Sequence, residues 1–122
     1  MRIYTVSHLC RVGSSALALA LNASAAAPAA WERLPPLPVG NGGFVGAAID
    51  GEIVVAGGTT WQGDTKIWLD RIWAYHPARI AWREAGRLAA PVAYAVTGQS
   101  GGTLWFAGGS SGTATNRSLW KL

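Results

Sequence analysis

The sequence predicts an all-β chain built from consecutive antiparallel meanders, and three observations lead to this prediction. The chain from Trp31 onward recurs once at an offset of 51 residues, which places Trp31 over Trp82 and Gly57 over Gly108. An apolar run ends in a glycine pair in each copy. Two-residue turn signals stand between neighbouring apolar runs.

Four strands are expected in the first copy of the repeat and three in the second. The first four cover residues 44–49, 52–56, 70–75 and 80–84, and the next three cover 93–99, 103–107 and 118–122. Asp50 and Gly51 predict a type I′ hairpin turn between the first two strands. Residues 53–56 are apolar on both alternations, which predicts a strand buried on both faces.

A repeat of this period, with a strand ending in a glycine pair and a tryptophan at constant phase, is typical of a four-stranded β-propeller blade. The structural positions of the repeat are Trp31, Gly57, Gly58, Tyr75, Trp82, Gly108 and Gly109. Each blade must stack on others to bury its faces. Because 122 residues hold only about two blades, we expect a partial chain that takes further blades from missing sequence or from another chain.

The chain divides into four segments on this reading. Residues 1–25 are expected to be a signal peptide that forms a helix, and residues 26–41 an irregular lead-in with a strand remnant at Trp31. Residues 42–84 form blade one, and residues 85–122 form an incomplete blade two. Three prolines and a glycine in residues 34–41 exclude a helix or a central strand there.

The first segment has the pattern of a targeting sequence. Arg2 and Arg11 precede an apolar run over residues 12–21, and small residues follow, with cleavage expected after Ala25 or Ala27. The run is too short for a bilayer, which needs about 20 apolar residues. Export to the periplasm or the extracellular space, without a stable membrane span after cleavage, is therefore expected; a short N-terminal core helix is the alternative.

Cleavage of this segment changes the chemistry of the mature chain. Cys10 is removed, which leaves no thiol for a disulfide or a nucleophile. The formal charge falls from +4 to about +2, and the remaining basic residues are scattered. This distribution excludes nucleic acid as an expected partner.

The repeat positions resemble a known family. Gly57 and Gly58, the run 70–75 that ends in Tyr75, and Trp82 resemble the kelch pattern. Residues 31–38, the insert at 59–69 and the run 91–96 are similar to the cyclically permuted, mutarotase-like branch, which includes N-acetylneuraminate mutarotases. The resemblance implies a kelch-type β-propeller fragment and a sugar isomerase activity.

Few residues indicate chemistry directly, and the catalytic acid and base stay unassigned. His76, the only histidine left after cleavage, has no partner at ligand spacing, so we expect neither a metal nor a cofactor. A turn position or a catalytic role remains open for His76. Asp70 fits a structural hydrogen bond in or between blades.

The insert at 59–69 is the best candidate for a ligand site, because it interrupts the repeat with aromatic and polar side chains. Blade topology brings the insert and the connection that contains Arg87 to one face. The expected substrate-binding residues are Trp61, Asp64, Lys66, Trp68 and Arg87. The alternative is that the insert only caps blade one, with Asp64 shaping its turn and Arg87 solvated.

Three function classes follow from these observations. The first is an exported sugar mutarotase-like protein, which the resemblance implies. The second is a non-catalytic carbohydrate- or protein-binding module, since fold does not determine function. The third is an incomplete and inactive gene product.

Overall fold

The computed structural model describes residues 28–122 and divides the chain into two compact units, Met1–Trp31 and Glu32–Leu122. Residues 28–31 of the first unit form no regular secondary structure. The expected signal peptide with its helix, and Cys10, lie outside the described residues. Trp31 ends the first unit, so its expected packing in a blade stays a prediction.

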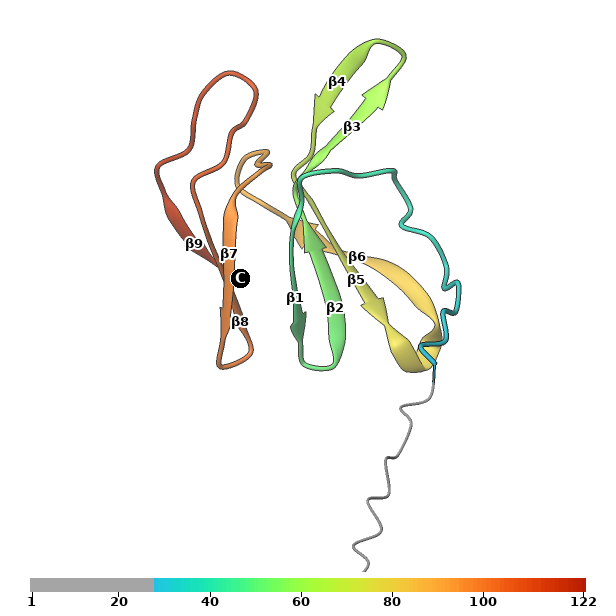
Figure 1. Ribbon diagram of the computed structural model, residues 1–122. Helices are drawn as coiled ribbons and strands as arrows, with labels where there is room; N and C mark the ends of the chain where they lie inside the picture. The colour runs from blue at the N-terminus through green and yellow to red at the C-terminus, as the bar shows by residue number, and fades with distance from the viewer. Residues whose placement is uncertain (1–27) are drawn as a thin grey trace, which may run out of the picture. The chain divides into compact units, whose positions relative to one another are not determined.

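Nine strands form three antiparallel sheets in the second unit (Figure 1). Blade one contains β1 (Val45–Ile49), β2 (Glu52–Ala56), β5 (Arg71–His76) and β6 (Ala81–Arg87), in that order. Blade two contains β7 (Val96–Ser100), β8 (Thr103–Ala107) and β9 (Leu119–Lys121). A separate hairpin pairs β3 (Thr59–Gln62) with β4 (Thr65–Trp68). These sheets confirm the all-β prediction.

Helix is limited, in residues 28–122, to one 3-10 turn, η1 (Pro77–Arg79). Among these residues no helix is long and apolar enough to cross a bilayer. Ile80 closes the turn with a φ of 53°. This left-handed conformation delays the start of β6 to Ala81, one residue beyond the expected position.

The turns between paired strands have the backbone that their sequences predict. Asp50 and Gly51 have φ values of 50° and 80°, and Gly101 and Gly102 have 56° and 73°. Positive φ at both central residues is the type I′ requirement, and its twist matches that of the flanking strands. The strands β7 and β8 consequently lie at the positions of β1 and β2 shifted by 51 residues.

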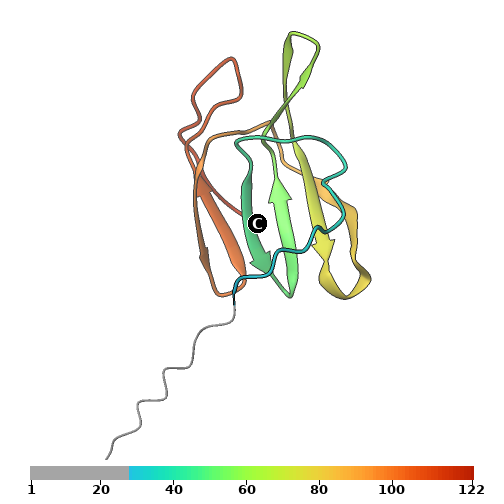
Figure 2. The same cartoon turned by 45° about the vertical axis from the view of Figure 1, so that its right-hand side comes forward.

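The insert at 59–69, for which no strand was expected, forms β3 and β4. Its threonines, tryptophans and Ile67 are β-branched or aromatic residues, which fit strands. Gly63 has a φ of 58° at the first central position of the turn, as a type II′ hairpin requires. Figures 1 and 2 show the hairpin extending beyond blade one, at the end opposite the Asp50 and Gly51 turn.

The glycine pair of blade one lies where the backbone connection to blade two passes. Gly57 and Gly58 have φ values of 64° and 98°. A Cβ atom on Gly57 would meet the carbonyl oxygen of Val92, and one on Gly58 would meet the side chain of Asn41. The Gly58 N–H donates to the Val92 carbonyl oxygen at 2.7 Å. Both the backbone conformation and the available space therefore require glycine.

The core lies between the two blades and uses one face of each. Val54 and Ala56 on β2 pack with Leu104 and Phe106 on β8. The other buried members are Val45, Ile72, Ala74 and Val92. The opposite face of blade one holds Tyr75, whose ring lies 5.2 Å from that of Trp82 between centroids. The Trp82 indole N–H donates to the Pro35 carbonyl oxygen at 2.9 Å, which fixes the lead-in beside this face.

The second face of blade two is open in the described part of the chain. Trp105 is 39% exposed and Val96 is 78% exposed. Their equivalents in blade one, Val54 and Val45, are 8% and 1% exposed because blade two covers them. Blade two therefore presents an apolar face of the kind that another blade would bury.

We predict that Trp105→Lys reduces self-association of the chain and changes its unfolding free energy by no more than about 1 kcal/mol. The change puts a charge on an open apolar face. The matched variant Val54→Lys should instead unfold the chain, because it buries an unpaired ammonium. Sedimentation velocity and urea denaturation measure the two effects. Unchanged association of Trp105→Lys would contradict the assignment of this face.

Candidate functional site

One face of the β3–β4 hairpin gathers three of the five predicted substrate-binding residues. Trp61 lies opposite Lys66 across the two strands, and Thr59 lies opposite Trp68. Directly opposed residues project to the same side, and alternate residues share a face. Thr59, Trp61, Lys66 and Trp68 thus lie on one face.

Tyr94, which the sequence analysis did not identify, packs against this face. The Lys66 ammonium donates to the Tyr94 hydroxyl at 2.8 Å, and the Thr59 hydroxyl lies 3.3 Å from it. The Trp68 and Tyr94 rings meet edge to face, with centroids 6.0 Å apart. Lys66 Nζ lies 4.9 Å and 4.8 Å from the centroids of these two rings. We call Thr59, Lys66, Trp68 and Tyr94 the hairpin cluster.

The backbone of Tyr94 is in a left-handed conformation that glycine normally occupies. Its φ is 62°, and Gly43, the equivalent residue of the first repeat, has a φ of 68°. A residue with a Cβ atom loses about 1–2 kcal/mol there. The Tyr94 N–H donates to the Gly43 carbonyl oxygen at 2.7 Å, and a Cβ atom on Gly43 would strike the Tyr94 ring. The tyrosine thus occupies a strained position that glycine would fit, which indicates a role for its side chain.

The hydrogen bonds of Tyr94 favour its ionised form. The Lys66 ammonium, and after it the Thr59 hydroxyl, lower the pKa of the Tyr94 phenol below its usual value of 10.0. The phenol remains accessible, since Tyr94 is 55% exposed. The arrangement offers an acidified hydroxyl, a cation and aromatic surface on one side of the hairpin.

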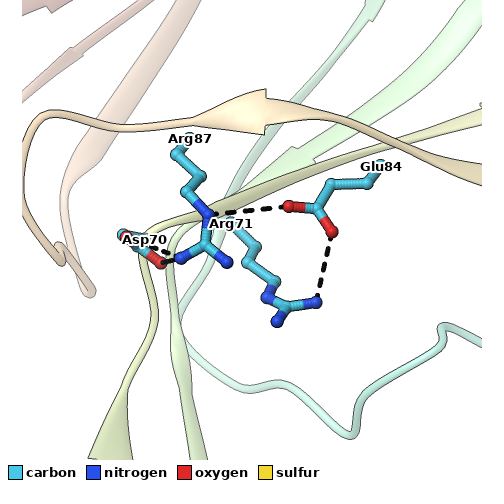
Figure 3. Close-up of polar contacts among 4 residues, drawn as sticks. All are labelled: Asp70, Arg71, Glu84 and Arg87. Atoms are coloured by element: carbon cyan, nitrogen blue, oxygen red, sulfur yellow. Dashed lines mark hydrogen bonds and ion pairs between the residues drawn. The ribbon is translucent and has the colours of Figure 1, made fainter.

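Asp64 and Arg87 do not belong to the hairpin cluster. Asp64 is exposed in the turn at the hairpin tip. Arg87 ends β6 and pairs with both carboxylate oxygens of Asp70, at 3.1 Å and 3.2 Å, while its Nε lies 3.6 Å from Glu84 (Figure 3). Glu84 also accepts from Arg71 at 3.2 Å. The charge of Arg87 is therefore balanced by carboxylates.

A hollow of about 360 Å³ lies beside the connection from β6 to β7. Arg87 lines it together with Phe106 and Trp120. Ser111 and Ala114 of the loop before β9 form another part of its wall, and Gly112 of that loop packs against the Trp68 indole. The loop thus borders both the hollow and the hairpin cluster.

The described residues show no metal centre. Among residues 28–122, no group of three His, Cys, Asp or Glu side chains is arranged to hold a metal ion. His76 ends β5, at the end of that strand away from the hairpin, and its Nδ1 is buried without a hydrogen-bond partner. This position separates His76 from the hairpin cluster.

Comparison with known proteins supports the fold. No protein-family model matches the chain, and no curated protein matches it. Among solved structures the chain is similar to YjhT, with a TM-score of 0.66 and 21% sequence identity. The match covers 74% of this chain and 30% of YjhT. Together with the antiparallel sheets, this likeness supports a β-propeller-like fold.

We predict that Tyr94→Gly is more stable than Tyr94→Ala by about 0.5–1 kcal/mol. Both variants lose the ring, but only glycine relieves the left-handed strain, and its greater unfolded-state entropy offsets part of that gain. Urea denaturation of the two variants measures the difference. An alanine variant as stable as the glycine variant would show that the position is not strained.

We also predict that Arg87→Ala lowers the unfolding free energy by no more than about 1 kcal/mol, because its ion pairs are solvent-exposed. The loss should shrink further in high salt, which screens exposed charges. Thermal unfolding at low and high salt measures it. A loss of several kcal/mol would mean that Arg87 contributes to packing beside the hollow.

Proposed function

We propose that this chain is part of an exported kelch-type β-propeller that binds an acidic sugar and interconverts its anomers, as the resemblance to N-acetylneuraminate mutarotases implies. The observation that carries the proposal is the hairpin face that holds Trp61 and Lys66, with the Tyr94 hydroxyl bonded to Lys66. Indole rings cover the apolar face of a pyranose, while hydroxyl and ammonium groups bind its polar substituents.

The exposure and charge of this face suit an anionic sugar. Trp61 is 63% exposed, so its ring is available for stacking. Within residues 28–122, Lys66 makes no ion pair with a carboxylate. Its ammonium can therefore bind the carboxylate of a sugar acid. Asp64 at the hairpin tip could accept hydrogen bonds from sugar hydroxyl groups.

Arg87 fits a second role at the hollow beside the β6–β7 connection. Because Asp70 and Glu84 hold its guanidinium, a ligand carboxylate would have to compete with both. We therefore assign the primary anion contact to Lys66 and a peripheral contact to Arg87. Further blades, from missing sequence or from another chain, would complete the surroundings of the face.

A non-catalytic carbohydrate-binding module is the second candidate. The openness of the site favours it, because Trp61 and Tyr94 are both more than half exposed. Catalytic sites usually exclude water from the reacting groups. Binding without anomer exchange would identify this alternative.

The test is a titration of the full chain with N-acetylneuraminate, followed by NMR for both binding and anomer exchange. We expect Trp61→Ala to weaken binding by about tenfold, which corresponds to about 1.4 kcal/mol of lost stacking. Its melting temperature should stay close to that of the unchanged chain. The matched control is Trp105→Ala, which removes an exposed indole from blade two, away from the hairpin. This variant should bind normally. Equal weakening by both variants would contradict the assignment of the hairpin face.

A further inference from the structure

We propose that Tyr94 and Lys66 act together as a proton-transfer pair that opens and closes the ring of a sugar bound on the hairpin face. The pair deepens the proposed function and rests on it. A tyrosine and a lysine are not the first residues to be considered as an acid–base pair, because histidine and carboxylates serve more often in that role.

The geometry holds the Lys66 ammonium and the Tyr94 hydroxyl next to each other. Lys66 Nζ and the Tyr94 hydroxyl oxygen are 2.8 Å apart, a distance suited to proton transfer. Lys66 is positioned by the pairing of β4 with β3. Tyr94 is positioned by its backbone hydrogen bond to Gly43 and by the edge-to-face contact between its ring and that of Trp68. The two groups come from different blades, so packing of the blades assembles the pair.

The repeat itself supplies an independent argument. Gly43 and Tyr94 occupy equivalent positions with nearly equal φ, so the fold there needs only a glycine. Blade two nevertheless carries a tyrosine, and its hydroxyl contacts Lys66 in the insert of blade one. A strained residue whose side chain meets a charged group is the pattern expected of a functional site.

The proton balance of the reaction is simple. The Tyr94 phenolate takes the proton of the anomeric hydroxyl, whose O–H electron pair becomes the second bond of the new carbonyl group. The bond from the anomeric carbon to the ring oxygen breaks, and that oxygen takes a proton from the Lys66 ammonium. Closure on the opposite face of the carbonyl reverses each step and returns both protons. No oxidant or reductant is needed.

The surroundings of the phenol favour its role as the base. Lys66 from β4 is the charged group that faces Tyr94, and Thr59 from β3 adds a hydroxyl. Trp68 and Gly43 contribute no group that titrates. The resulting lower pKa of the Tyr94 phenol increases its ionised fraction near neutral pH.

Anomer exchange of N-acetylneuraminate by the full chain tests the pair. We expect Tyr94→Phe to slow exchange by about 100-fold or more while its binding stays within about threefold, because only the hydroxyl is lost. Lys66→Met should slow exchange and also weaken binding. The matched control Tyr75→Phe lies on the opposite face of blade one and should leave both unchanged.

The pH dependence gives a readout that a structural role would not move. The exchange rate should rise as the pH increases through the lowered pKa of Tyr94, because the phenolate is the base. NMR of tyrosine labelled at Cζ follows the ionisation directly. In Lys66→Met, the Tyr94 titration should move toward its usual value near 10.

Each outcome separates the pair from the wider proposal. Normal exchange by Tyr94→Phe would overturn the pair and leave the mutarotase function standing. Binding without any exchange in the unchanged chain would overturn the pair and favour a binding module. Absence of binding would overturn both proposals.

Discussion

The contact between the two blades is the constraint on which the rest of this structure depends. A single blade exposes an apolar face that only a neighbour can bury. Here Val54 and Ala56 of blade one meet Leu104 and Phe106 of blade two. Gly57 and Gly58 let the two backbones approach, and the Gly58 N–H binds the Val92 carbonyl oxygen at 2.7 Å. Without this approach the connection that leads to Tyr94 would have no defined path.

The candidate site follows from the same contact. Val92 is held by the glycine pair, and the chain reaches Tyr94 two residues later. The Tyr94 N–H then bonds to Gly43, which precedes β1, and its ring turns toward the hairpin that follows β2. Backbone interactions thus balance a strain of about 1–2 kcal/mol at Tyr94. The side chain is placed by the packing of the blades, whereas its local conformational preference opposes that placement.

The sequence predicted the strands well where turn chemistry was strong. Residues 52–56 and 103–107 are strands with the expected bounds, because the dipeptides Asp50-Gly51 and Gly101-Gly102 define the hairpins before them. The β3–β4 hairpin was missed because its polar composition resembles a loop. The structure shows that Trp61 pairs with Lys66, so alternate residues of the two strands share one face of the hairpin.

The site was predicted less completely, for a physical reason. Tyr94 meets Lys66 across 28 positions of sequence and between two blades, and such a contact depends on tertiary packing. From the sequence, Arg87 was expected to be free to bind a ligand. Its pairing with Asp70 depends on the strand register of β5 and β6, which includes a bulge between Ile72 and Trp73. One signal of Tyr94 was present in the sequence, since it replaces the glycine that the repeat has at residue 43.

Two departures from the 51-residue repeat meet at one place in the structure. Blade one departs by its longer insert, which folds into the hairpin, and blade two departs by carrying Tyr94 where blade one has Gly43. Neither change falls among the buried core residues that pack the two blades together. Changes that were merely tolerated could fall anywhere on the loops, yet these two are joined by the Lys66 to Tyr94 hydrogen bond. A direct hydrogen bond between Lys66 and Tyr94 supports the proposal that the hairpin face has a function that needs both blades at their boundary.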